Sequence, residues 1–88
     1  MARVKIFSTG HCPMCDRAKK LLGKWGIPYE EVRVDGNRAG LIEMARLTGG
    51  ARTVPQFSID GQWIGGFTEL TELHMDKGLD HLVAHESD

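Results

Sequence analysis

The pattern of hydrophobic and polar residues changes from alternation to helical spacing early in the chain. Val4 and Ile6 alternate with charged neighbours, which predicts a short strand that ends before Thr9-Gly10. From Pro13 onward, apolar side chains recur at the i, i+3, i+4, i+7 spacing of one helix face, namely at Ala18, Leu21, Leu22 and Trp25. We therefore expect a first helix that ends near Gly26.

The middle of the chain predicts one further helix and three strands. Residues 29–34 alternate and predict a second strand, and residues 38–47 predict a helix that is closed by a pair of glycines. Residues 53–59 predict a third strand that is entered through a proline. Asp60-Gly61 is typical of a two-residue hairpin turn, here into a fourth strand at residues 62–64.

Two helices are expected in the last quarter of the chain. The first carries Leu70, Leu73 and Met75 and should stop at Gly78, and a short last helix follows with Leu79, Leu82 and Val83. Crossover helices imply parallel pairing of the first strands, and the hairpin adds antiparallel partners. We predict one α/β domain over residues 1–88, with a four-stranded mixed sheet, helices on both faces, and the order β-α-β-α-β-β-α plus a short C-terminal helix.

Composition and charge are those of a small globular protein. A chain of 88 residues has room for one core, and 41% hydrophobic with 26% charged residues indicates neither disorder nor a membrane span. A net charge of −1 indicates no basic surface for nucleic acid. The N-terminal segment carries charges inside its apolar stretch and so lacks the core of a secretory signal. We expect a cytoplasmic monomer that binds neither nucleic acid nor membranes.

The two cysteines are three residues apart, directly after the first strand and at the start of the first helix. Residues i and i+3 of a helical turn bring their side chains within about 5–6 Å, close to disulfide geometry. Pro13 suits the first helical position, and the free amides and positive end of the helix favour a thiolate at Cys12. In a reducing compartment such a pair is typical of redox catalysis, with Cys12 attacking and Cys15 resolving.

Metal binding is the main alternative for a close cysteine pair. A structural zinc site needs four ligands, and only two thiols are present. His81 and His85 are spaced i, i+4 on the last predicted helix and could share a metal ion, but a solvated helix face explains them more simply, so we predict no metal site. His11 precedes Cys12, where a charged imidazole would help to stabilise the thiolate or would be an ordinary loop residue.

Four short motifs occur in a fixed order along the chain. They are Cys12-Pro13-Met14-Cys15, Thr53-Val54-Pro55, Gly65-Gly66 and Gly78-Leu79-Asp80. In this combination the chain resembles the glutaredoxin family over nearly its whole length. The resemblance implies a thioredoxin-like fold, reduction of protein disulfides and glutathione mixed disulfides, and glutathione as electron donor. We expect no tightly bound cofactor.

The resemblance also implies a substrate site. Pro55 resembles the family's cis-proline, and a cis bond would turn the backbone of Val54 toward the cysteines, where a substrate can pair as an added strand. The glycine pair lets a ligand approach the main chain before a helix whose N-terminus, with Thr68 as its cap, can hold a glutathione carboxylate. The predicted substrate or glutathione site comprises Thr53, Val54, Pro55, Gly66, Phe67 and Thr68, and His11 and Pro13 are predicted to tune the thiolate.

Some positions depart from the family's usual residues. Met14 stands where many glutaredoxins have tyrosine, Thr9 where a lysine is common, and Phe67-Thr68 where cysteine-aspartate is usual. Weak glutathione binding is therefore expected. The glycine-phenylalanine pair resembles instead the redoxins that serve ribonucleotide reductase, so a protein reduced by thioredoxin reductase stays open as an alternative. A metal or iron–sulfur module, in which two chains share Cys12 thiolates, is the other alternative.

Overall fold

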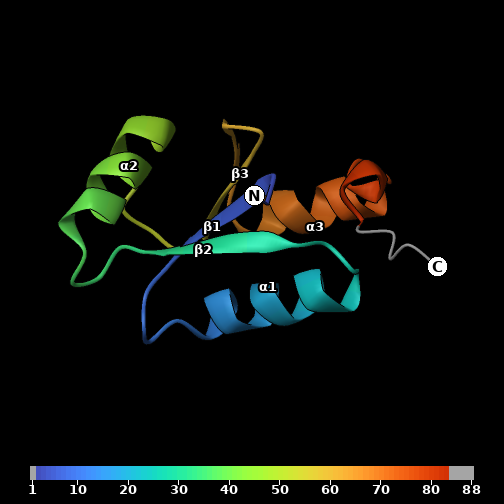
Figure 1. Cartoon of the computed structure of the whole chain (residues 1–88), viewed down its shortest axis with the longest axis horizontal. Coiled ribbons are helices and arrows are strands. Elements are labelled where there is room, and N and C mark those ends of the chain that lie inside the picture. The colour runs from blue at the N-terminus through green and yellow to red at the C-terminus, as the bar shows by residue number, and fades with distance from the viewer. Residues whose placement is uncertain (1, 84–88) are drawn as a thin grey trace.

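The computed structural model describes residues 2–83, which form a four-stranded sheet with three α-helices and a final 3₁₀ turn (Figure 1). In chain order the elements are β1 (Val4–Ser8), α1 (Pro13–Lys24), β2 (Tyr29–Arg33), α2 (Arg38–Thr48), β3 (Gln56–Ile59), β4 (Gln62–Gly65), α3 (Phe67–Met75) and η1 (Asp80–Leu82). The predicted order of strands and helices is confirmed as far as α3.

The sheet is mixed, and its strands lie in the order β2-β1-β3-β4. The two strands joined through α1 are parallel, with Val4 opposite Tyr29. β1 also pairs antiparallel with β3, where Val4 lies opposite Ile59, and the hairpin adds β4 as an antiparallel edge strand. A crossover helix gives parallel neighbours and a tight turn gives antiparallel ones, so the connections themselves account for the mixed sheet.

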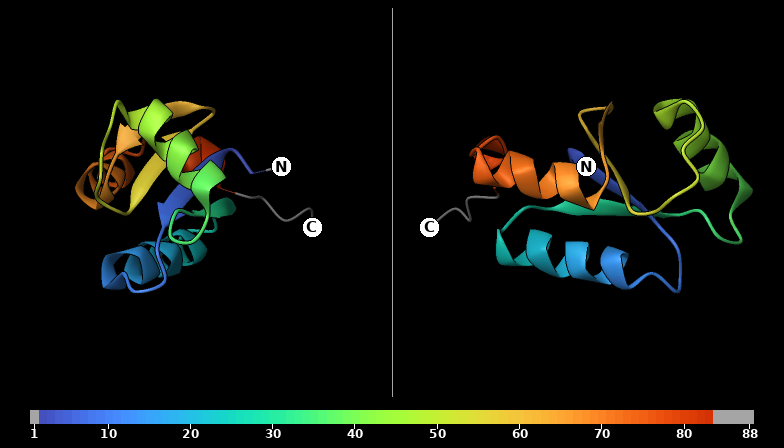
Figure 2. Two further views of the ribbon diagram at one scale, coloured as in Figure 1. Left: turned by 90° about the vertical axis from the view of Figure 1, so that its left-hand side faces the viewer. Right: turned by 180° about the vertical axis from the view of Figure 1, so that it is seen from behind.

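Helices cover both faces of the sheet, as predicted (Figure 2). Alternation along β1 directs Val4 and Ile6 toward α1 and α3, whereas Phe7 points toward α2. Each fully buried side chain of this size contributes roughly 1.5–3 kcal/mol to folding. The larger cluster, on the α1 and α3 face, consists of Val4, Ile6, Ala18, Leu22, Ile27, Phe57, Leu70, Leu79 and Leu82. The smaller cluster consists of Phe7, Val34 and Met44.

The third strand begins later than predicted, at Gln56 rather than at Thr53. The residues before it form a loop that contains the cis Val54–Pro55 peptide bond, and proline has no N–H to donate to a sheet. The end of α2 is close to the prediction, because Gly49 takes the left-handed conformation, with φ of 72°, that closes a helix.

The two predicted C-terminal elements are present, and α3 ends earlier than expected. α3 ends at Met75, three residues before Gly78. Lys77 takes a left-handed φ of 62°, and the Gly78 N–H donates to the Leu73 carbonyl. These two features form a Schellman motif that closes the helix. Met75 is 79% exposed and does not face the core. The expected last helix is only the 3₁₀ turn η1, and His85 lies outside the described residues.

Candidate active site

The first turn of α1 positions the two cysteines. Cys12 is the N-cap, with an extended backbone at φ −137° and ψ 94°, and Pro13 occupies the first helical position as predicted. The Cys15 N–H donates to Sγ of Cys12 at 3.0 Å. Among the free amides at the helix start, that of Cys15 therefore faces the sulfur as expected, and that of Met14 makes no such hydrogen bond among the described residues.

Cys12 and Cys15 form a disulfide, with their Cα atoms 5.1 Å apart. This separation is within the range of about 4.4–6.8 Å that disulfides accept. Cys12 is 8% exposed, whereas Cys15 is fully buried against the sheet. A partner sulfur can therefore reach Cys12 more readily, in accordance with the order of attack predicted from the sequence.

The cis-proline loop lies against Cys12. The peptide bond between Val54 and Pro55 is cis, as the resemblance implied, and the Val54 carbonyl oxygen is 3.9 Å from Sγ of Cys12. A side-chain carbon at Gly66 would stand 3.3 Å from the Pro55 carbonyl oxygen. The glycine pair therefore lies directly beside this loop, and three motifs that are far apart in the sequence meet at one place.

A cavity of about 670 Å³ opens at this meeting point. All six residues predicted to bind substrate or glutathione line it. The lining also contains Gly65, the other member of the glycine pair, and residues that were not predicted to bind substrate, which are Met14, Gln56, Trp63, Ile64 and Glu69. The Asp60-Gly61 turn sets Trp63 opposite Ser58, and alternation along β3 puts Gln56 on the same face as Ser58. The hairpin turn was therefore the signal that could have placed Trp63 beside Gln56.

The predicted cap of α3 was wrong. The N-cap is Gly66, and the Glu69 carboxylate accepts a hydrogen bond from the Gly66 N–H at 2.8 Å. α3 begins at Phe67, so Thr68 is already its second residue, and its side chain is too far along the helix to act as the N-cap. A glutamate three residues after an N-cap is the signal that could have identified Glu69.

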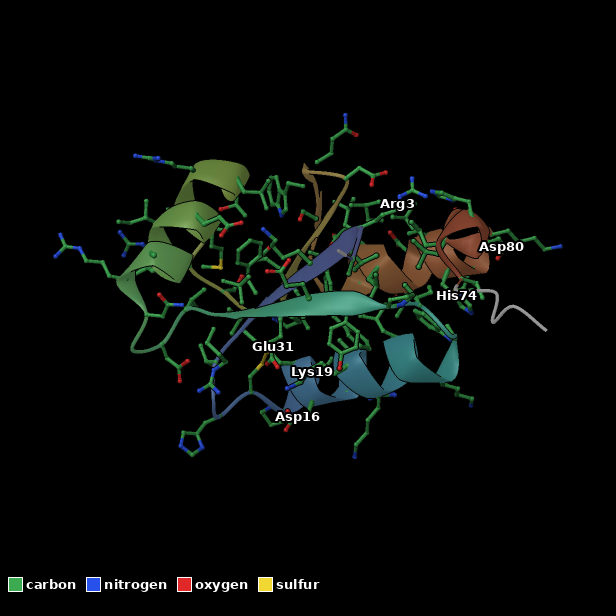
Figure 3. The ribbon with its side chains drawn as sticks, viewed as in Figure 1. Arg3, Asp16, Lys19, Glu31, His74 and Asp80 are labelled. Carbon is green, nitrogen blue, oxygen red and sulfur yellow. A yellow bond between two sulfur atoms is a disulfide. The ribbon has the colours of Figure 1, made fainter. Side chains whose placement is uncertain are left out.

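A small charged network lies beside the cysteine helix. Lys19 of α1 reaches both Asp16 and the Glu31 carboxylate of β2, at 3.6 and 2.9 Å (Figure 3). The fully buried Ser8 hydroxyl also donates to Glu31. The Ser8 hydrogen bond, followed by that from Lys19, holds the pKa of the Glu31 carboxyl below its usual value.

The remaining predicted groups give less to the site. His11 is exposed, and no hydrogen bond joins it to either sulfur among the described residues. The guanidinium of Arg17, which was not predicted to belong to the site, stands 5.8 Å from the ring centre of Phe67.

Within residues 2–83, no three His, Cys, Asp or Glu side chains are grouped as metal ligands. In the same range, every helix is too short or too polar to cross a membrane.

The Glutaredoxin family model matches residues 4–64, more than half of the chain. The chain belongs to the glutaredoxin family. Glutaredoxin 3 of Escherichia coli K12 is 45% identical over 83 residues, which cover 94% of this chain and 99% of that protein. A glutaredoxin of Neisseria meningitidis serogroup A is 39% identical over 84 residues, covering 94% of this chain and 98% of its own.

Solved glutaredoxin structures share the fold. A buckwheat glutaredoxin–glutathione complex superposes with a TM-score of 0.79 at 32% identity, covering 94% of this chain and 83% of the other. Glutaredoxin 1 from Francisella tularensis, complexed with cacodylate, gives a TM-score of 0.71 at 33% identity, covering 91% and 99%. The thioredoxin-like fold is thus confirmed, and this glutaredoxin, with its cysteine pair at the helix mouth, is a glutathione-linked thiol-disulfide oxidoreductase.

Proposed function

We propose that this glutaredoxin reduces protein disulfides and glutathione mixed disulfides through a mixed disulfide at Cys12 that Cys15 resolves. The observation that carries the proposal is the contact between the Cys15 amide and the Cys12 sulfur at the start of α1. An N–H donor and the positive end of a helix stabilise negative charge on that sulfur. The same sulfur is the less buried of the two and lies 3.9 Å from the carbonyl oxygen of Val54, which lines the cavity.

The proposed reaction transfers two electrons in two exchanges. The Cys12 thiolate attacks one sulfur of the substrate, a new S–S bond forms, the substrate S–S bond breaks, and the departing thiolate takes a proton. The Cys15 thiol then loses its proton and attacks Cys12, which releases the second substrate thiolate to be protonated. The protein ends with the Cys12–Cys15 disulfide seen in the structure.

Backbone groups are suited to hold the substrate during these steps. The Val54 carbonyl faces the reacting sulfur, and an extended segment that adds beside the cis-proline loop would be recognised through its main chain. Thr53, Val54 and Pro55 supply one wall of this cleft, and the start of α3 supplies the other. Such recognition allows many protein disulfides to react at one site.

Glutathione is the proposed electron donor, since the relatives are glutaredoxins and the buckwheat structure is a complex with glutathione. Two glutathione thiols would reduce the Cys12–Cys15 disulfide and leave as one glutathione disulfide. We place the protein in the cytoplasm, where a close cysteine pair is more often catalytic than structural. We also propose that the protein acts as a monomer and that it holds no tightly bound cofactor.

Reduction by thioredoxin reductase is the second candidate. It is favoured by the cavity lining, in which Glu69 is the one charged residue and no cation is present to meet the carboxylates of glutathione. The test supplies oxidised protein either with glutathione, glutathione reductase and NADPH, or with thioredoxin reductase and NADPH. NADPH oxidation coupled to reduction of a disulfide substrate in the first system supports the proposal, and turnover only in the second contradicts the choice of donor.

A further inference from the structure

Trp63 is a large aromatic side chain that the described fold leaves 46% exposed beside the redox site. It lies on the edge strand β4 and lines the cavity next to the cysteines. Met14, which stands between the two cysteines in the sequence and is 40% exposed, lines the same cavity. The cavity therefore has apolar side chains on both the β4 side and the α1 side.

Hydrogen bonds hold the indole of Trp63 in place. Its Nε1–H donates to Oε1 of Gln56 at 2.8 Å. Gln56 is 6% exposed, and its Nε2 donates to the carbonyl and the hydroxyl of Thr53 at 3.0 and 3.2 Å. The polar edge of the ring is thus tied to the cis-proline loop. A ring that is fixed before binding loses little conformational entropy when a ligand covers it.

The side chains that line the cavity are mostly uncharged. Glu69 is the one charged residue among those that line the cavity, and its Oε1 is engaged with the Gly66 N–H. The surface next to Trp63 is therefore suited to an apolar side chain.

We propose that Trp63 is a specificity-determining residue that selects protein disulfides with an apolar side chain beside the reacting cysteine. The inference rests on the proposed function and names its substrate class. An extended polypeptide segment would place its sulfur at Cys12, its main chain along Val54 and its apolar side chain against the indole. Continuity of the cavity with the exchange site supports a polypeptide as the occupant, because Val54 contributes both to the lining and to the contact with Cys12.

The test uses two short peptides, each bearing a disulfide, that are identical except for leucine or serine next to the reacting cysteine. kcat/KM is measured for both peptides with the wild type, Trp63→Ala, Trp63→Phe and Leu41→Ala. Leu41 is the matched control, because it is 49% exposed on α2 and does not line the cavity. Thermal unfolding of each variant accompanies the kinetics.

We expect the wild type to prefer the leucine peptide by about tenfold, the size of effect that a well-placed aromatic contact gives. Trp63→Ala should reduce this preference to about twofold, and Leu41→Ala should retain it. Trp63→Phe should lie between, because it keeps a ring but loses the hydrogen bond to Gln56.

Two results would overturn the inference. The first is that the wild-type protein shows no preference for the leucine peptide. This result does not depend on whether any variant folds. The other is a Trp63→Phe protein, with unfolding like that of the wild type, that loses activity on both peptides equally. In either case, Cys12-dependent turnover of both peptides would leave the proposed function standing. Failure of the wild type to reduce any disulfide would instead refute the proposed function.

Discussion

The cysteine side and the cavity side of this site are built from different kinds of groups. On the cysteine side, the groups that approach the Cys12 sulfur belong to the main chain, namely the Cys15 amide and the Val54 carbonyl. On the cavity side, the surface is formed largely by side chains such as Trp63 and Met14, both partly exposed. Main-chain groups stay in place when surface residues change. We therefore expect the chemistry to remain constant while the cavity side, through the inferred role of Trp63, sets the choice of partner.

The largest expected effect is on the cysteine side. Cys12→Ser should abolish the reduction of every disulfide, because serine cannot form the mixed disulfide. Cys15→Ser should accumulate that mixed disulfide with protein substrates and keep activity on glutathionylated ones, where a second glutathione can release the product. Turnover of both substrate types, with mass spectrometry of the trapped adduct, measures the difference. A Cys15→Ser protein that is inactive throughout, beside an active Cys12→Ser protein, would mean that the two roles are reversed.

Sequence reasoning predicted the cysteine side well, because its determinants are local. The positions of Cys12, Pro13 and Cys15 after a strand fix a helix start with few alternatives. The cis bond before Pro55 and the meeting of the motifs came from the family resemblance, which carries tertiary information that no single segment holds. The six proposed binding residues do line one cavity, although their role in binding remains a prediction.

The cavity side was less predictable because it depends on side-chain competition and on long-range pairing. Thr68 is a good N-cap residue by type, but the N-cap is Gly66, two residues earlier, and the Glu69 carboxylate accepts from its N–H. Gly78 is a good helix stop, yet Lys77 adopts the left-handed conformation that ends α3 before it. The bond between Trp63 and Gln56 joins two strands, and it becomes visible only once the hairpin register is known.

The cavity side can be disturbed through its backbone at Gly65. Gly65 has a φ of 114°, a backbone conformation that residues with a side chain rarely adopt. A Cβ added here would stand 2.6 Å from Cγ of Glu69. Gly65→Ala should lower the free energy of unfolding by about 1–3 kcal/mol. Denaturant unfolding measures the loss. Gly23→Ala is the control, since its added carbon meets nothing within 4 Å, and it should stabilise α1 by about 0.5–1 kcal/mol. Equal stabilities for the two variants would contradict the expectation.

A smaller effect concerns pH on the cysteine side. Ser8 and Lys19 lower the pKa of the Glu31 carboxyl, whose side chain is 31% exposed. A lowered folded-state pKa gives stability that is present above the unfolded value of about 4.3 and is lost as the pH falls through the folded value. Glu31→Gln should therefore cost about 0.5 kcal/mol at pH 7, and the cost should shrink below about pH 4. Urea unfolding of both proteins from pH 7 to pH 3 measures this difference. A cost that does not change over this range would show that the carboxylate charge contributes nothing.

The smallest expected effect concerns charge at Thr9, which follows β1 where many glutaredoxins carry a lysine. An ammonium there would stand a few residues before Cys12 and would attract the carboxylates of glutathione, which meet no cation in the cavity lining. In the neighbouring loop Asp35 accepts from the Gly10 N–H and is already paired with Arg33, so it adds no net charge there. A single flexible ammonium near the surface has only a modest effect. Thr9→Lys should therefore raise kcat/KM for a glutathione mixed disulfide by only about twofold at low salt, and the gain should disappear at about 1 M salt, where charges are screened within about 3 Å. Thr9→Gln, of similar reach but neutral, should show no gain. An equal gain in both variants, or a gain that persists in high salt, would mean that side-chain shape rather than charge limits glutathione at this position.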